Sequence, residues 1–394
     1  MNLKRFLTVA LACLLSLSLV ACNPDDTVVN VDTDTDKGAS VTDALTDDTA
    51  ATETQKTVVT KTYNATEILE NSKILGRTSV EADGLAFDHS SAGLEFNAYV
   101  EGAITVEITV AKGKEDSNND DCYFTLFIDG VRREERVKAV KNTKTTTVLA
   151  TFEEGGVHNV RLVRQTEARN ALAAVTSLTF TGYFENKPAN APYYIEFMGA
   201  SNTAGYGNLT SAKEATVAQL AENQDSTQSY TYLTAEKLGA DYSMLSVSGI
   251  GAVKGYRQYP LKAVFDANSY FRNKSVVYTP VRTPDLVVIA VGSNDESKGT
   301  TQAEYRQGII DLITGVRMTY GDIVPIVWVY YTENMTYRAT AKEAIAVCGG
   351  EGALIYDVEV LFNKLGGNNH PDLQSHRDGA EKLTQFIKDI NVLG

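Results

Sequence analysis

The sequence predicts a two-domain fold, in which an all-β sandwich or jelly roll precedes a three-layer α/β/α domain built on a parallel sheet. Three observations predict it. Residues 63–186 contain short strands separated by turns and no long helix, which is typical of a β-sandwich. A joint containing Pro and Asn follows at residues 186–190. From residue 190 to 394, strands alternate with helical stretches, a pattern that indicates a parallel sheet covered on both faces.

The first 22 residues have the order of charges and apolar residues that is typical of a secretory signal. Lys4 and Arg5 precede an apolar run at residues 6–20, and the segment ends in the letters LVAC. This run is shorter than the roughly 20 residues of a spanning helix. LVAC resembles a bacterial lipobox, which implies a lipid on Cys22; the alternative is an ordinary secretory signal with a coincidental cysteine. We expect an exported lipoprotein, anchored through Cys22 at the cell surface or facing the periplasm.

Acidic residues are concentrated directly after this signal. Residues 23–56 carry nine carboxylates against Lys37 and Lys56, which accounts for half of the net charge of −14. The stretch is rich in Thr and Asp and has no apolar periodicity, so we expect residues 23–62 to form a disordered acidic tether. The chain has no basic patch, which argues against nucleic acid as a partner. We expect contact with a membrane only through the lipid anchor.

The predicted β domain, residues 63–186, is defined by alternating apolar positions. Its strands are expected at residues 94–100, 104–110, 123–127, 145–150, 157–163 and 175–180, and Asp129-Gly130 is a plausible hairpin turn. Cys122 falls in this domain and Cys348 in the next. Neither belongs to a Cys-x-x-Cys motif or a Cys/His cluster, so the sequence predicts no metal site.

The second domain, residues 190–394, is predicted from five strands and four helices. The strands are expected at residues 193–198, 242–247, 286–291, 323–330 and 354–358, and the helices at 227–238, 301–318, 337–348 and 374–389. In parallel sheets of this kind, ligands bind beyond the carboxyl ends of the strands. The residues that follow each strand are therefore the candidates for chemistry.

Four short blocks at these positions carry groups that an acyl transfer needs. Residues 199–207 read GASNTAGYG, 246–251 read SVSGIG, 292–295 read GSND, and 369–376 read NHPDLQSH. They supply a nucleophile candidate in Ser201, glycines for backbone donors, the Asn294 amide, and His370 as a base. Taken singly, each block is equally consistent with a helix cap or a turn. Thr203 replaces the second glycine of a Gly-x-Ser-x-Gly elbow, which argues against an α/β-hydrolase.

In this order and spacing, the four blocks resemble those of the SGNH (GDSL-like) hydrolase superfamily. More narrowly, IEFMGAS at residues 195–201, followed by TAGYG, is similar to carbohydrate esterase family 2. GRT at 76–78, GLAFD at 84–88 and LVRQTE at 162–167 are similar to the β-sandwich that this family places before its hydrolase domain. The resemblance implies removal of acetyl groups from plant polysaccharide such as xylan or glucomannan, without a metal or organic cofactor.

The resemblance also implies roles for individual residues. Ser201 would be the nucleophile and His370 the general base and acid. The N–H of Ser201, the N–H of Gly249 and the amide of Asn294 would form the oxyanion hole, with Gly251 as the alternative backbone donor.

Two positions depart from the family pattern. Ala200 stands where the family usually has Asp, and Gly367 stands where the superfamily usually has the Asp that orients the histidine. We therefore expect a Ser–His dyad whose imidazole is oriented by a backbone carbonyl, or by Asp295 or Asp372. His376 is expected to have a surface or capping role.

Three further residues, Tyr206, Gly251 and Trp328, are candidate substrate-binding residues; for Trp328 the alternative is a core position in an apolar strand. Besides the polysaccharide deacetylase, two functions remain open: a surface glycan-binding protein on a weakened or inactive esterase scaffold, which Ala200 favours, and a lipase kept near a membrane by its anchor.

Overall fold

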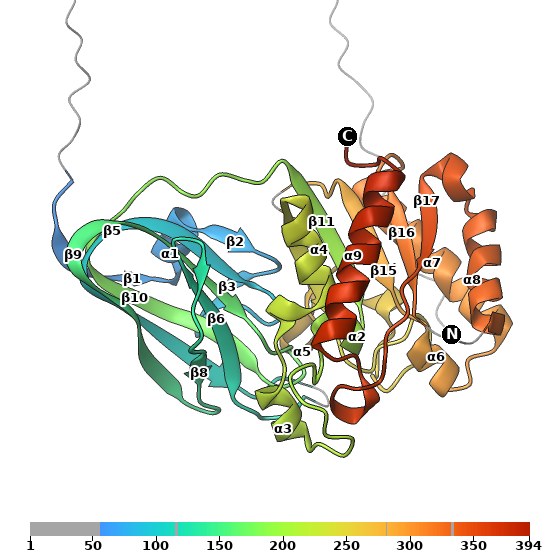
Figure 1. The fold of residues 1–394 in the computed structure, drawn as a ribbon, viewed down its shortest axis with the longest axis horizontal. Coiled ribbons are helices and arrows are strands. Elements are labelled where there is room, and N and C mark those ends of the chain that lie inside the picture. The colour runs from blue at the N-terminus through green and yellow to red at the C-terminus, as the bar shows by residue number, and fades with distance from the viewer. Residues whose placement is uncertain (1–55, 115–116, 281, 332–334) are drawn as a thin grey trace, which may run out of the picture. The chain divides into compact units, whose positions relative to one another are not determined.

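In this computed structural model the described residues are 56–394, without 115–116, 281 and 332–334 (Figure 1). The signal, Cys22 and most of the predicted tether therefore lie outside the described residues. The strand β1 (Val59–Asn64) pairs with β10, so residues 59–62, which we expected in the tether, form part of the β domain. Among the described helices, none is long and apolar enough to cross a membrane.

The first domain is one antiparallel sheet that curls around its own apolar core. Its strand order is β3-β4-β10-β5-β9-β6-β7, with β1 on β10, β2 on β5 and β8 on β6. The strands are β1 with β2 (Lys73–Leu75), β3 (Ser79–Glu81), β4 (Gly84–Ala86), β5 (Gly93–Ala111), β6 (Cys122–Ile128), β7 (Val131–Arg132), β8 (Val137–Ala139), β9 (Lys144–Arg164) and β10 (Leu172–Phe184), and one short helix, α1 (Ala65–Asn71), follows β1.

Alternation along the long strands directs every second side chain into this core. In β5, for example, Phe96, Ala98 and Val100 are buried while the residues between them are partly exposed. The hairpin at Asp129-Gly130 forms as expected, with both residues in the left-handed region and Ile128 paired with Val131.

The second domain has a five-stranded parallel sheet in the order β12-β11-β15-β16-β17. Its strands are β11 (Tyr193–Gly199), β12 (Ala240–Ser246), β15 (Leu286–Ala290), β16 (Ile326–Tyr330) and β17 (Ile355–Glu359). The long helices are α4 (Tyr230–Leu238), α7 (Gln302–Tyr320), α8 (Met335–Val347) and α9 (Leu373–Asp389). The shorter elements are α2 (Ser201–Ala204), α3 (Val217–Glu222), α5 (Tyr270–Asn273), α6 (Ser293–Ser297), and the hairpin of β13 (Ala267–Ser269) and β14 (Lys274–Val277).

Helices cover both faces of this sheet, which makes the domain three-layered. The helices α4 and α9 lie side by side over one face (Figure 1), where they pack on residues such as Phe197 and Val288. The helices α7 and α8 cover the other face with residues such as Met198 and Trp328. The predicted fold class is therefore confirmed. All four sequence blocks lie in segments that follow the carboxyl ends of strands in this sheet.

Candidate active site

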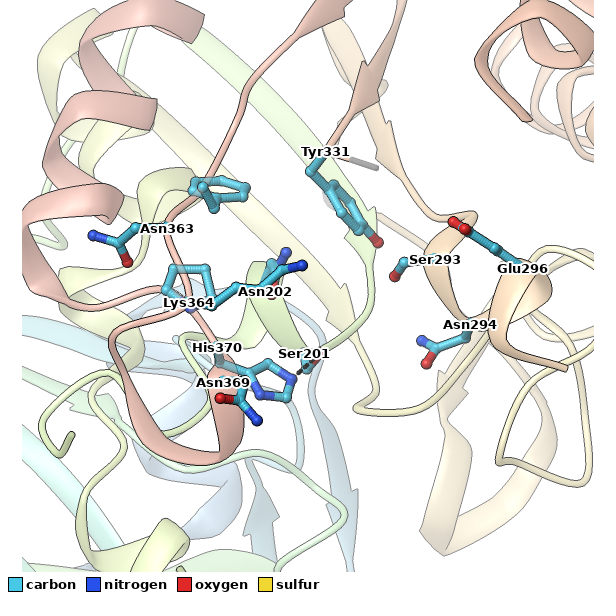
Figure 2. A pocket seen from close by; sticks show the side chains of 12 residues that line it. Ser201, Asn202, Ser293, Asn294, Glu296, Tyr331, Asn363, Lys364, Asn369 and His370 are labelled. Atoms are coloured by element: carbon cyan, nitrogen blue, oxygen red, sulfur yellow. Dashed lines mark hydrogen bonds between the residues drawn. The ribbon is translucent and has the colours of Figure 1, made fainter. Parts of the chain in front are cut away.

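The nucleophile candidate and the histidine are brought together although they are far apart in the chain. Ser201 is the first residue of α2, directly beyond β11, and His370 immediately precedes the turn into α9. Their side chains form a hydrogen bond of 2.9 Å between Ser201 Oγ and His370 Nε2 (Figure 2). With its hydrogen on Nδ1, the imidazole can accept the hydroxyl proton of Ser201, as a general base must.

A backbone carbonyl holds the other side of the imidazole ring. His370 Nδ1 lies 3.0 Å from the carbonyl oxygen of Asn368. Asn368 and Asn369 both adopt positive φ, a conformation that asparagine tolerates better than most residues, and this turn aims the carbonyl at the ring. Of the acceptors we considered for His370, the backbone carbonyl is therefore the one that the structure contains.

The two aspartates that we considered as orienting groups have other partners. Asp295 accepts hydrogen bonds from the N–H groups of Ala252, Val253 and Lys254, and it thereby braces the loop after β12. Burial raises the pKa of the Asp295 carboxyl, against the effect of those three donors. Asp372 caps α9 by accepting the Ser375 N–H. Neither carboxylate orients His370.

The electrostatic surroundings favour a neutral His370. Burial is the main reason that the pKa of His370 is lower than its usual value, and the positive charge of Arg169 lowers it further. The guanidinium of Arg169 lies over the ring of Tyr206, at 5.9 Å, and that ring in turn packs against His370 with centroids 4.6 Å apart. A neutral imidazole at neutral pH is the form that can act as a base.

Donors suited to an oxyanion lie at the same rim. Ser201 begins α2, so its N–H has no partner within that helix. Gly249 has a φ of +87°, which a residue with a side chain rarely adopts, and within the described chain no acceptor faces its N–H. Asn294 Nδ2 donates to the Ile250 carbonyl at 2.8 Å, which leaves the second amide hydrogen for another acceptor. In Figure 2, Asn294 lies across the cleft from Ser201 and His370.

Ser201, Asn294 and His370 border a cleft of about 330 Å³ whose wall is mostly polar. It is lined by Ser201, Asn202, Ser293, Asn294, Glu296, Tyr331, Phe362, Asn363, Lys364, Asn369, His370 and Pro371. Four of these residues are asparagines and two, Glu296 and Lys364, are charged. Besides the His370 imidazole, the rings of Tyr331 and Phe362 lie in this described wall. Within the described residues, no group of three His, Cys, Asp or Glu side chains is arranged to hold a metal ion.

None of the three candidate substrate-binding residues lines this cleft. Trp328 is 0% exposed in the core between β16 and the α7–α8 layer, so it is a core residue and not a sugar platform. Tyr206 is buried behind His370, where it supports the imidazole. Gly251 is buried behind the rim, since a side chain there would meet the Lys254 carbonyl and the Asp295 carboxylate.

His376 is buried and has no surface role. Its Nδ1 accepts the N–H of Tyr230, the first residue of α4, at 3.2 Å. It is therefore a capping residue for a neighbouring helix, and burial lowers the pKa of His376 to about 3.

Cys122 and Cys348 are both free thiols.

Sequence reasoning missed several residues that shape the site. The letters GGNN at residues 366–369 signal a turn with unusual backbone angles, but they do not say which carbonyl faces His370. Asn363 and Tyr331, which line the cleft, and Arg169, which lies near it, are unremarkable in the sequence. Ala200 is fully buried in an apolar cluster, so no carboxylate stands beside the nucleophile at that position.

This domain has a parallel sheet between two layers of helices, with serine, glycine, asparagine and histidine at the rim of the sheet. That arrangement defines the class of GDSL-like hydrolases. Residues 195–384 match the family model described as GDSL-like lipase/acylhydrolase, and residues 74–189 match the one described as carbohydrate esterase 2 N-terminal. Two segments of the chain thus match, separately, a GDSL-like lipase/acylhydrolase domain and the N-terminal domain of carbohydrate esterase 2.

Several known proteins are similar to this chain. Cellulase/esterase CelE of Acetivibrio thermocellus is 29% identical over 77% of this chain and 37% of its own length. An acetylxylan esterase/glucomannan deacetylase of Cellvibrio japonicus is 32% identical over 38% of this chain and 42% of its own. The chain thus spans less than half the length of these two curated relatives. The structure of a family two carbohydrate esterase from Clostridium thermocellum in complex with cellohexaose has a TM-score of 0.70 and 26% identity, covering 81% of this chain and 98% of that one.

Proposed function

We propose that this protein is an exported, lipid-anchored carbohydrate esterase that removes O-acetyl groups from a polysaccharide of the xylan or glucomannan kind. The observation that carries the proposal is the 2.9 Å hydrogen bond between Ser201 Oγ and His370 Nε2 at the polar cleft that Asn294 also lines. The relatives named as acetylxylan esterases support the substrate class. Export and the anchor rest on the LVAC sequence that ends in Cys22.

In this mechanism, His370 Nε2 removes the Ser201 proton while Oγ attacks the acetyl carbonyl carbon. The carbonyl oxygen becomes an oxyanion, which accepts hydrogen bonds from the N–H groups of Ser201 and Gly249 and from the Asn294 amide. His370 then gives its proton to the leaving sugar oxygen, which leaves an acetyl group on Ser201. Water, activated by the same imidazole, hydrolyses this ester and releases acetate.

The polar wall of the cleft favours a sugar over a lipid. A long acyl chain requires an apolar channel, whereas Asn202, Asn363 and Lys364 offer hydrogen bonds to hydroxyl groups. We therefore expect acetyl esters to be hydrolysed much faster than long-chain esters.

The test compares wild type and Ser201→Ala on 4-nitrophenyl acetate, on a longer-chain ester, and on acetylated xylan, with released acetate as the readout. Wild type should release acetate, and Ser201→Ala should lose turnover while keeping its thermal unfolding temperature. Binding of xylan without acetate release would instead favour a glycan-binding protein on an inactive scaffold. Faster turnover of the long-chain ester would favour a lipase.

Mass spectrometry of the mature protein should find acyl groups on Cys22, and an unmodified N-terminus elsewhere would contradict the anchor.

A further inference from the structure

A carboxylate from the β domain reaches the rim of the hydrolase sheet. Glu167 follows β9 and is 0% exposed. Its Oε2 accepts the backbone N–H of Ser248 at 2.7 Å, and Ser248 immediately precedes Gly249. This contact joins the first domain to the backbone that supplies the proposed oxyanion donor.

The segment that carries Glu167 is itself held in place. The buried guanidinium of Arg164 donates to the carbonyl oxygens of Phe87 and Glu167, at 2.7 and 3.0 Å. The N–H of Asn170 donates to the same Glu167 carbonyl at 3.0 Å. The carboxylate is therefore presented by a rigid turn and not by a flexible side chain on the surface.

Four other backbone groups of the 247–250 turn also have hydrogen-bond partners. The N–H of Val247 donates to Gly199, and that of Ile250 donates to Val247. The carbonyl of Gly249 accepts from Tyr256, and that of Ile250 accepts from Asn294. The Ser248 N–H that Glu167 holds belongs to the Val247–Ser248 peptide group. This contact therefore anchors the backbone directly before the Ser248–Gly249 peptide, which carries the Gly249 N–H.

The cost of placing Glu167 here argues for a role. Burying a carboxylate with few partners is expensive, and within the described residues its Oε1 has no hydrogen-bond partner. A negative charge near an oxyanion hole would also oppose the oxyanion that forms there. The benefit to the site is that Glu167 Oε2 is placed where it accepts the Ser248 N–H. This benefit does not depend on the charge, because the uncharged amide oxygen of glutamine could accept the same N–H.

We propose that Glu167 is a positioning residue for the esterase reaction: it orients the Ser248–Gly249 peptide so that the Gly249 N–H points into the cleft. The β domain thereby completes the active site of the hydrolase domain. This inference rests on the proposed function, since it assigns a task to the oxyanion donor of that reaction.

The test uses three variants of the whole protein. Glu167→Gln keeps an acceptor oxygen at the same reach without the charge, and it should retain kcat within about threefold. Glu167→Asp keeps the charge but withdraws the acceptor by one methylene, and Glu167→Ala removes it. The Asp and Ala variants should lower kcat for 4-nitrophenyl acetate at least tenfold with little change in KM. The loss should stay below the roughly 10²–10³-fold expected when one oxyanion donor is removed completely. Glu154→Ala, an exposed position on β9, is the control and should match wild type.

A second readout separates positioning from folding. A small alkylboronic acid forms a tetrahedral adduct with the serine, which places an oxygen in the oxyanion hole; its affinity should fall in Glu167→Asp but not in Glu167→Gln. Thermal unfolding identifies any variant that fails to fold. Among the folded variants, the comparison of Glu167→Asp with Glu167→Gln then shows whether Glu167 acts by positioning the acceptor oxygen. Full kcat in folded Glu167→Asp, or equal losses in the Asp and Gln variants, would overturn the inference. Absence of turnover in wild type would overturn the proposed function instead.

Discussion

At the scale of single residues, the proposed mechanism makes the protonation state of His370 the lower pH limit of activity. Burial, aided by Arg169, lowers the pKa of this imidazole below its usual 6.5. The base is lost when it is protonated, so the acid limb of the kcat/KM profile should lie below pH 6.5.

Arg169→Gln tests the electrostatic part of this shift. Removing the positive charge should raise the pKa of His370, so the acid limb should move to higher pH. Arg133→Gln, an exposed change in the same domain, should leave the profile unmoved. A profile of Arg169→Gln that coincides with that of wild type would mean that burial alone sets the pKa.

His376 should matter for stability and not for turnover. In His376→Ala the buried N–H of Tyr230 loses its acceptor, which costs about 1–3 kcal/mol. Urea unfolding should show this loss, while kcat of the folded protein should stay near wild type. His376→Asn should lose less, because its amide oxygen can accept the same N–H. A fall in kcat as large as that of His370→Ala would contradict a capping role.

The positions of single residues were predictable from the sequence where a strand end fixed the place of the side chain. The four blocks correctly placed Ser201, Gly249, Asn294 and His370 at one rim, because parallel strands all end there. Trp328 and Tyr206 were misjudged because the sequence does not tell which face of a strand or turn is covered. Glu167 ends the LVRQTE segment that the resemblance singles out, but its contact was not predictable, because its partner, Ser248, lies in the other domain and bonds through its backbone.

At the scale of elements, the segment between β17 and α9 orients His370 without a carboxylate. Asp372 begins α9 and bonds to Asn363, whereas the Asn368 carbonyl faces the imidazole. Asp372→Asn keeps a side chain that caps helices as well as aspartate does. We therefore expect kcat to fall less than about tenfold, against roughly 10²–10⁴-fold for His370→Ala, which removes the general base. Equal losses in the two variants would mean that Asp372 acts on the imidazole during turnover.

The lengths of the elements were less predictable than their types. The long helices end close to where their apolar periodicity ends. In the β domain, however, the predicted strands 94–100 and 104–110 are one strand, β5, and 145–150 and 157–163 are one strand, β9. Gly102 has a positive φ and coincides with a shift in register, so the strand bends there without ending. In the sequence, a glycine between two apolar runs is equally consistent with a turn that ends the strand and with a bend inside one long strand. Only the pairing with the neighbouring strand decides between these alternatives.

At the scale of the whole described chain, a buried ion pair links the two domains. Arg77 follows β2 in the β domain, and Glu196 lies in the middle of β11; both side chains are 0% exposed, and Arg77 Nη2 lies 2.7 Å from Glu196 Oε1. Arg77 also donates to the carbonyls of Ala267 and Phe265. The β domain thus supplies the counter-charge that the central sheet of the hydrolase domain needs.

We therefore expect the two domains to unfold together. Trp328 is the only tryptophan and lies in the core of the hydrolase domain, so its fluorescence reports on that domain, whereas far-UV circular dichroism reports on both. The two signals should change at the same denaturant concentration. Arg77→Met leaves Glu196 buried without its counter-charge, which should cost about 3–5 kcal/mol and shift both curves equally. Adding Glu196→Gln removes the unpaired charge and should restore part of that loss. If β-sheet dichroism persisted after the Trp328 transition, the domains would unfold independently and the ion pair would be a local contact only.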